Sequence, residues 1–212
     1  YGRPARDDRS GMIPPKLAQI MINLADGTPE RSGGGPSRPL SKRTTLLDPF
    51  CGSGTILTEA LLMGYDNVIG TDISEKAVND TKKNIAWAER RFKIKDLRFK
   101  IFNKSAAELS KFIKPNSIDA IVTEPYLGPQ RGRVDFKKVI KELEDLYGKS
   151  LIEFKKVLKS RERAVMVWPV FRATHNSQRI TPKLNGFKIV NPISPGLREN
   201  AIIKLTDRNT II

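Results

Sequence analysis

Two short segments carry the residues whose types and spacing could do chemistry. The first is DPFCGSGTILTEA, residues 48–60, in which an acid and two spaced glycines separate a short apolar run from a helical one. This order predicts a strand, a glycine turn and a helix. In an open parallel sheet, such a turn holds an adenine-containing ligand over the carboxyl ends of the strands. The second segment, TEPY at residues 123–126, follows another apolar run.

The residues around the glycines discriminate between three classes of ligand. A P-loop needs Gly-Lys-Ser/Thr so that the lysine reaches the phosphates, but Gly54 is followed by Thr55 and Ile56. A dinucleotide site favours a third glycine, whose place is taken by Leu57. S-adenosylmethionine (SAM) has no phosphate, and Gly52 and Gly54 would let the backbone approach it closely. SAM is therefore the expected ligand.

Two aspartates are placed to bind the polar ends of SAM. Asp48 could accept a hydrogen bond from the ammonium group, directly or through water. Asp72 ends the next predicted strand, at the spacing of about 20 residues at which an acid binds ribose hydroxyls. Ser74 is placed to cap the following helix, which leaves Asp72 for a ligand. A Cys/His nucleophilic pair is not expected, because Cys51 lies in the loop and the single histidine, His175, lies in a different polar segment.

Strands and helices alternate along most of the chain. Helices are predicted over residues 14–24, 55–63, 75–92, 106–112 and 136–158. Strands are predicted over residues 44–47, 67–73, 96–102, 118–123, 164–168, 186–190 and 201–205. The last two are expected to pair antiparallel at the sheet edge. The pattern predicts an α/β Rossmann-like sandwich with a mostly parallel, seven-stranded sheet and an antiparallel edge strand.

The bulk properties favour one domain with a basic surface. A chain of 212 residues can bury a single core. Lys and Arg total 38 against 23 acids, so the formal net charge is +15. Much of the excess falls in residues 82–104, 131–141 and 155–163. Nucleic acid is the expected partner of such a surface. No apolar run reaches ~18 residues, so no membrane span is expected.

The start of the chain and one internal segment bear on domain organisation. The sequence begins Tyr-Gly-Arg-Pro without a methionine, so we expect a fragment that lacks its N-terminal part. Residues 26–43 are rich in Gly, Pro, Ser and charge, and are expected to form a flexible loop. One domain is expected over 1–212, with an N-terminal helical segment near the ligand (1–25) and a Rossmann-like core (44–212). The single cysteine and the lack of a signal peptide suit a cytoplasmic protein.

The motifs together resemble those of the Rossmann-like amino-methyltransferases that act on nucleic acids. The residues that carry the resemblance are Asp48-Pro49-Phe50-Cys51-Gly52-Ser53-Gly54-Thr55, Gly70-Thr71-Asp72 and Thr123-Glu124-Pro125-Tyr126. More narrowly, the chain is similar to the catalytic domain of the THUMP-associated tRNA guanosine-N2-methyltransferases, including the archaeal position-10 enzymes. Residues 3–7 and 11–18 resemble the region that precedes the glycine loop in that family. The resemblance implies SAM as cofactor, no metal, and an RNA-binding N-terminal domain that is absent from this chain.

The resemblance also implies which residues form the site. Cofactor contacts are expected from Asp48, Phe50, Gly52, Gly54, Asp72, Ile73, Ser105 and Ala106. At the acceptor motif, the carboxylate of Glu124 and the carbonyl of Pro125 would accept the two N–H bonds of an exocyclic amine. They would direct its lone pair towards the methyl group and stabilise the charge that develops on nitrogen. Tyr126 would stack on a base turned out of its helix.

Two positions depart from the family pattern. The family usually has Asp-Pro-Pro-Tyr after the fourth strand, whereas residues 124–126 are Glu-Pro-Tyr, with a longer acid and an earlier aromatic. This leaves open whether guanine, adenine or cytosine fits. Many relatives place an acid beside the adenine after the third strand, and here Asn103 or Ser105 is the candidate. Trp168 and Phe171 are expected to pack in the core, with a base pocket as the alternative.

The sequence therefore predicts a SAM-dependent methyltransferase that acts on RNA, with tRNA as the expected substrate and guanine N2 as the expected atom. One alternative is a DNA or rRNA methyltransferase that acts on adenine or cytosine. The other is a non-catalytic RNA-binding module that kept the fold. The intact set of Asp48, Gly52, Gly54 and Asp72 argues against the module, because a pure binding module has no need of a cofactor cleft.

Overall fold

The computed structural model describes residues 2–5, 12–26, 44–129, 135–172, 177–180, 182–189 and 209–211. The helices are α1 (Pro15–Asp26), α2 (Thr55–Leu62), α3 (Glu75–Phe92), the 3-10 helix η1 (Ala106–Lys111) and α4 (Phe136–Val157). The strands are β1 (Thr45–Asp48), β2 (Asn67–Asp72), β3 (Arg98–Asn103), β4 (Ile118–Thr123), β5 (Leu158–Arg172), β6 (Ser177–Arg179) and β7 (Asn209–Ile211). None of the described helices is long and apolar enough to cross a membrane.

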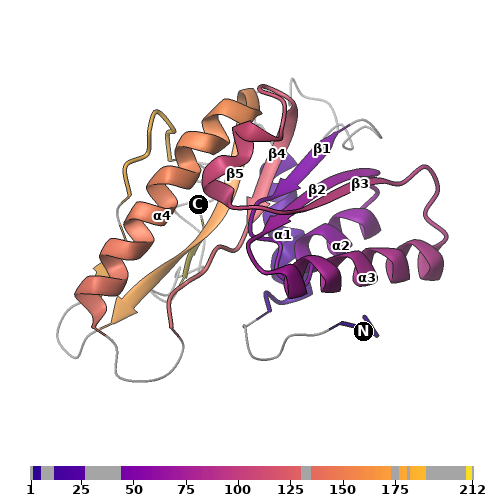
Figure 1. Cartoon of the computed structure of the whole chain (residues 1–212), viewed down its shortest axis with the longest axis horizontal. Coiled ribbons are helices and arrows are strands. Elements are labelled where there is room, and N and C mark those ends of the chain that lie inside the picture. Colours follow the sequence, from indigo (N-terminus) through magenta and orange to yellow (C-terminus); the bar gives the residue numbers. More distant parts are fainter. Residues whose placement is uncertain are drawn as a thin grey trace, which may run out of the picture.

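One sheet of seven strands organises the molecule (Figure 1). Its order is β3-β2-β1-β4-β5-β6, and β7 also pairs with β5. Strands β1 to β5 are parallel, whereas β6 and β7 run antiparallel to β5. The predicted α/β fold, with a mostly parallel sheet and an antiparallel edge, is confirmed. The strand order reverses between β1 and β4, so their carboxyl ends form the switch point at which such sheets bind ligands.

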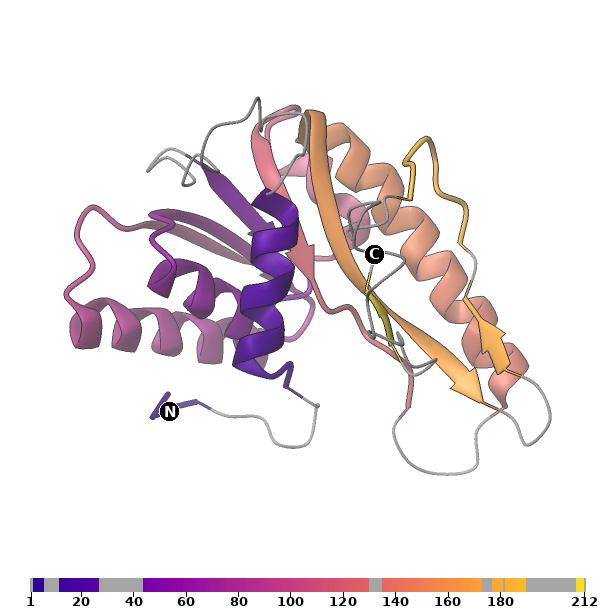
Figure 2. The ribbon, with the colours of Figure 1, turned by 180° about the vertical axis from the view of Figure 1, so that it is seen from behind.

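Helices cover both faces of this sheet (Figure 2). α1, α2 and α3 pack on one face, over a core that includes Met21, Leu57 and Val68. α4 and η1 cover the other face, over a core that includes Tyr147 and Phe154. The burial of these apolar side chains stabilises the fold by about 25 cal/mol per Å² of apolar surface removed from water. The two cores hold the strand ends in fixed relative positions.

Side-chain caps fix where two of the long helices begin. The Ser74 hydroxyl accepts a hydrogen bond from the Ala77 N–H at 3.3 Å, so Ser74 caps α3 as predicted. The Asp135 carboxylate accepts from the N–H groups of Lys137 and Lys138 at the start of α4. Both caps satisfy backbone donors that have no partner within the first turn.

The boundaries of two parallel strands differ from the prediction. β5 begins at Leu158 rather than at residue 164, because Leu158 already pairs with Ile118 of β4, and the pairing resumes at Arg163 after a register shift. The polar run that follows Leu158 hides this pairing in the sequence. β3 begins at Arg98 rather than at residue 96.

The predicted strand over residues 186–190 is wrong where the structure describes it. Asn185 and Gly186 form a turn with φ angles of 52° and 93°, and the Phe187 N–H donates to the Leu184 carbonyl. Phe187 packs against the core beneath α4 instead of pairing in the sheet. The antiparallel edge is made by β6 and β7. The predicted strand over 201–205, the loop residues 27–43 and His175 lie outside the described residues.

Candidate active site

The glycine loop leaves β1 through backbone conformations that glycine adopts most readily. Gly52 has a φ of 51°, and a Cβ added there would meet nothing within 4 Å. Gly54 has a φ of 82° and precedes α2, and a Cβ added there would lie 2.9 Å from Cγ2 of Thr81. Gly54 is therefore required for packing as well as for conformation. Gly52 faces open space, in which a ligand can approach the backbone.

Asp72, at the end of β2, holds the glycine loop in place. Its Oδ2 accepts a hydrogen bond from the Gly52 N–H at 3.0 Å, and its Oδ1 accepts one from the Ser74 N–H at 2.8 Å. Ser74 caps α3 in place of Asp72, but Asp72 is not free, because it already accepts these two backbone hydrogen bonds. Each carboxylate oxygen keeps a second lone pair for a ligand. The side chain of the next residue, Ile73, is 78% exposed and presents an apolar surface beside this carboxylate.

Asp48, at the end of β1, is a carboxylate that is only 1% exposed. Its Oδ1 accepts hydrogen bonds from the Thr123 hydroxyl at 2.7 Å and from the Phe50 N–H at 3.2 Å. Its Oδ2 has no hydrogen-bond partner among the described residues. Burial raises the pKa of Asp48 to about 7; the two hydrogen bonds oppose this, and the nearby Asp72 and Glu124 carboxylates add to it. A cationic ligand group beside Oδ2 would stabilise the ionised form.

Asp48→Asn tests the cost of this buried charge. The pKa of Asp48 in the folded protein lies above its ordinary value of 3.8. Between about pH 4 and pH 7 the folded protein therefore binds more protons than the unfolded chain, and stability falls as the pH rises through this window. The neutral amide keeps an acceptor oxygen for its two donors. We expect similar free energies of unfolding for variant and parent at about pH 4, and a more stable variant at about pH 8, by at most about 4 kcal/mol.

Urea denaturation at the two pH values measures this difference. Asp145→Asn, on an exposed stretch of α4, is the matched control and should show little change with pH. If Asp48→Asn changed the free energy of unfolding equally at both pH values, the raised pKa of Asp48 would be contradicted.

The acceptor motif follows β4, whose neighbour in the sheet is β1. The carboxylate of Glu124 accepts a hydrogen bond from the Ile13 N–H, which lowers the pKa of Glu124. Burial has the larger effect and raises this pKa to about 7. Tyr126 is 57% exposed, and the backbone carbonyl of Tyr126 accepts a hydrogen bond from the Tyr147 hydroxyl at 2.7 Å. No donor in the described part of the chain bonds the Pro125 carbonyl. The motif therefore presents one carboxylate and one unoccupied carbonyl.

The residues after β3 already make contacts within the protein. The Asn103 amide donates to the carbonyls of Asp72 and Ile73, at 3.0 and 2.9 Å, and ties the end of β3 to the end of β2. The Ser105 hydroxyl caps η1 by accepting from a backbone N–H at 3.2 Å, and Ala106 is buried. The hydroxyl proton of Ser105 is still available to donate. Ser105 is thus the better candidate of the two for contact with an adenine.

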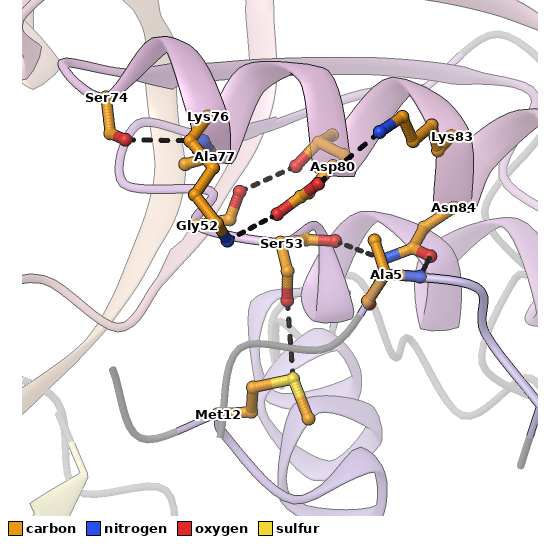
Figure 3. Close-up of polar contacts among 11 residues, drawn as sticks. Ala5, Met12, Gly52, Ser53, Ser74, Lys76, Ala77, Asp80, Lys83 and Asn84 are labelled. Atoms are coloured by element: carbon orange, nitrogen blue, oxygen red, sulfur yellow. Dashed lines mark hydrogen bonds and ion pairs between the residues drawn. The ribbon is translucent and has the colours of Figure 1, made fainter. Parts of the chain in front are cut away.

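The N-terminal segment lies against the glycine loop (Figure 3). The fully buried Asn84 side chain donates to the carbonyls of Ala5 and Ser53 and accepts from the Ala5 N–H. The Ser53 hydroxyl donates to the sulfur of Met12 at 3.4 Å. Since the next residue, Ile13, bonds the acceptor carboxylate, this segment links the glycine loop to the acceptor motif.

Three residues that stand out in the sequence have packing roles. Cys51 is buried, and burial raises the pKa of its thiol, which stays protonated and is a poor nucleophile. Trp168 and Phe171 both pack against the core beneath α4, as expected.

Three residues that hydrogen-bond to the site were not predicted from the sequence: Thr123, Asn84 and Tyr147. Thr123 could have been found, because it is the last residue of β4 and lies at the carboxyl end of the sheet with Asp48. Asn84 and Tyr147 lie on the buried sides of long helices, and their partners are distant in the sequence. No local pattern separates them from ordinary core positions.

The polar groups at this edge of the sheet fit SAM. The ammonium group and ribose hydroxyls of SAM need acceptors, and Asp48 and Asp72 supply carboxylate oxygens at adjacent strand ends. Gly52 leaves room beside the backbone, and the exposed side chain of Ile73 can contact an adenine ring. Among the described residues, no group of His, Cys, Asp and Glu is arranged to hold a metal ion.

Comparisons with known proteins agree with this geometry. A family model described as RMKL-like, methyltransferase domain, matches residues 3–180. The chain is 36% identical over 118 residues to a tRNA (guanine(10)-N2)-dimethyltransferase of Methanothermobacter thermautotrophicus, and 29% identical over 140 residues to one of Methanocaldococcus jannaschii. These matches cover 56% and 64% of this chain, but only 28% and 35% of the two relatives. The structure is similar to that of TrmN from Thermus thermophilus, with a TM-score of 0.51 and 26% identity over 72% of this chain and 37% of TrmN.

The family match spans most of the chain, including the glycine loop, Asp72 and the acceptor motif. The resemblance seen in the sequence is confirmed at the level of the family and the fold. The chain belongs to the RMKL-like methyltransferase domain family and is a SAM-dependent methyltransferase domain with a Rossmann-like fold.

Proposed function

We propose that this domain methylates the exocyclic N2 of guanine in tRNA. The observation that carries the proposal is the acceptor motif, in which the Glu124 carboxylate and the unoccupied Pro125 carbonyl follow β4, next to the strand that leads into the glycine loop. Support for tRNA and for guanine N2 comes from the names of the two archaeal relatives. The net charge of +15 suits a polyanionic substrate.

The chemistry requires that a weak nucleophile be held in one orientation. The lone pair of an exocyclic amine is delocalised into the base. SAM, when bound, supplies a methyl group whose bond to a sulfonium sulfur breaks as the new N–C bond forms. Glu124 and the Pro125 carbonyl each accept one N–H bond and so direct the lone pair towards the methyl group. The nitrogen then loses one proton, which the Glu124 carboxylate, with a pKa of about 7, can accept.

The rest of the motif positions the base. The exposed ring of Tyr126 offers a face on which an unstacked base can lie. The carbonyl of the same residue is held by Tyr147, which is fully buried on α4. Burial raises the pKa of Tyr147, and the Glu124 carboxylate raises it further, so the hydroxyl stays protonated and continues to donate. The motif is therefore anchored to α4 on one side and to the N-terminal segment on the other.

Tyr147→Phe should lower kcat for methyl transfer about tenfold while the Kd for SAM stays unchanged. The variant loses one hydrogen bond, worth about 1 kcal/mol, but keeps the ring in the core. The loosened acceptor motif then spends less time in the reactive orientation. Steady-state kinetics with tRNA and calorimetric titration with SAM provide the two readouts.

Tyr65→Phe is the matched control for this variant. Tyr65 is also a buried tyrosine, but it lies just before β2, at the end of the sheet opposite the acceptor motif. We expect this control to change the melting temperature and to leave kcat unchanged. Equal losses of kcat in the two variants would contradict a positioning role for Tyr147.

A pair of tRNA substrates that differ by one amine tests the proposed atom. Inosine in place of the guanosine at position 10, the position named in the relatives, removes only the exocyclic amine. We expect tritium transfer from labelled SAM to the unmodified transcript, and none to the inosine transcript or to duplex DNA. Transfer to the inosine transcript at the same rate would contradict guanine N2 at this position. A protein that binds no SAM in calorimetry would instead be a non-catalytic module.

A further inference from the structure

We propose that one exposed edge of the domain binds the phosphate backbone of RNA. This inference rests on the proposed function and names the surface that the tRNA would contact outside the active site. The surface is formed by the end of α3, the loop that follows it, β3 and the residue after β3. We call it the basic edge, and its cations are Arg90, Arg91, Lys93, Lys95, Arg98, Lys100 and Lys104.

The basic edge runs along the outermost parallel strand of the sheet. β3 pairs with β2 and has no strand on its other side among the described residues. At about 3.3 Å per residue, β3 extends for roughly 17 Å from Arg98 to Asn103. Its carboxyl end lies beside Asp72, because Asn103 and Asp72 are register partners. The edge therefore begins at the cofactor end of the sheet and is long enough to meet several phosphates.

Six of the seven cations of this edge lack an acidic partner, whereas several lysines elsewhere on the described part of the domain have one. Among the residues the structure describes, ion pairs outside the edge include those of Lys111 with Glu108, Lys149 with Asp145, Lys156 with Glu153 and Lys159 with Asp119. Within the edge, Arg98 pairs with Asp66 at 3.5 Å. The other six cations have no described carboxylate within 4.0 Å. Their mutual repulsion is relieved by a polyanion.

Two exposed aromatic rings lie among these cations. Phe92 is 47% exposed and Phe99 is 38% exposed. The guanidinium of Arg91 lies 5.8 Å from the centre of the Phe92 ring. Interleaved cations and rings are typical of surfaces that bind RNA, where rings stack on unpaired bases and cations contact phosphates.

Local explanations account for only part of this surface. Cations in the last turn of a helix interact well with its dipole, which explains Arg90 and Arg91. Lysines on an edge strand oppose unwanted strand pairing, which explains Lys100. The dipole also reaches Lys93, which is the C-cap residue of α3. Neither effect accounts for Lys95 or for the exposed rings. A neighbouring cavity of about 370 Å³ is lined by Asp66 and Asp96 as well as by Lys95, so its lining is not uniformly basic, and the phosphates are expected along the outer edge.

A charge-matched pair of triple variants tests the basic edge. The test variant carries Arg90→Gln, Lys95→Gln and Lys100→Gln, all distant from the acceptor motif. The control carries Lys111→Gln, Lys149→Gln and Lys159→Gln, which changes the net charge equally at paired lysines. Fluorescence anisotropy measures binding of unmodified tRNA over a range of salt concentrations. At about 0.1 M salt we expect the test variant to lose about 10- to 100-fold in affinity, and the slope of log K against log salt to fall by about 2.

The control variant should lose no more than about threefold in affinity. Equal losses in the two variants, or no loss in the test variant, would overturn the proposal. Binding of duplex DNA that is tighter than that of tRNA, and equally dependent on the three cations, would overturn the assignment to RNA. Calorimetry should give the same Kd for SAM in both variants. If tRNA bound through this edge but were never methylated, the proposed function would fail while the binding surface stood.

Discussion

Glu124→Gln is expected to lower kcat for methyl transfer by about 10²- to 10³-fold, with little change in the Kd for SAM. The amide can still accept a hydrogen bond from the Ile13 N–H, so the motif should keep its conformation. It carries no charge to stabilise the positive nitrogen and cannot take up the released proton. Single-turnover rates with tRNA measure the loss, and calorimetric titration with SAM shows whether the cofactor site is intact.

Glu124→Asp is the matched control, because it keeps the carboxylate and introduces the acid that the family usually has. It should retain far more activity than Glu124→Gln. The pH profile gives a second readout, because the parent rate should rise as the pH increases through about 7, where the Glu124 carboxyl ionises. A Gln variant with the rate or the pH profile of the parent would show that Glu124 is not the acceptor.

Gly54→Ala is expected to reduce the free energy of unfolding by about 2–4 kcal/mol. The added methyl group would lie 2.9 Å from Thr81, and the φ of 82° is one that alanine rarely adopts. Thr81 cannot easily give way, since its hydroxyl donates to the Gly52 carbonyl at 2.8 Å. For a chain of this length, the melting temperature should fall by roughly 5–15 °C.

Gly64→Ala separates the steric contact from the conformational cost. Gly64 has a φ of 95°, but a Cβ added there would meet nothing within 4 Å. This control should cost only about 1 kcal/mol. Equal losses at the two positions would mean that the contact with Thr81 contributes nothing to the requirement for glycine at residue 54.

The parts of the site that the sequence predicts well are those with local signals. The strand, glycine turn and helix at residues 45–62 are specified by neighbours in the chain, as is the Ser74 cap of α3. Asp72 was expected to be available for a ligand, and the structure adds two backbone hydrogen bonds that the spacing alone could not reveal.

The parts that were missed depend on contacts between distant residues. The hydrogen bonds of Tyr147 to the acceptor motif and of Asn84 to the N-terminal segment join elements far apart in the sequence. The early start of β5 was hidden because a polar run at a register shift separates Leu158, which pairs with β4, from the rest of the strand. Residues 186–189 have apolar character but follow a turn at Asn185, so Phe187 packs on the core outside the sheet.

The central claim is that this domain methylates N2 of guanine in tRNA, and nucleoside mass spectrometry tests it most directly. The chain is incubated with SAM and either unmodified tRNA or duplex DNA, and each nucleic acid is then digested to nucleosides. We expect N2-methylguanosine or its dimethylated form from tRNA, and no methylated nucleoside from DNA. A methylated adenine or cytosine from either substrate would contradict the assignment to guanine N2 and would point to the longer acid at Glu124 as the source of the altered specificity.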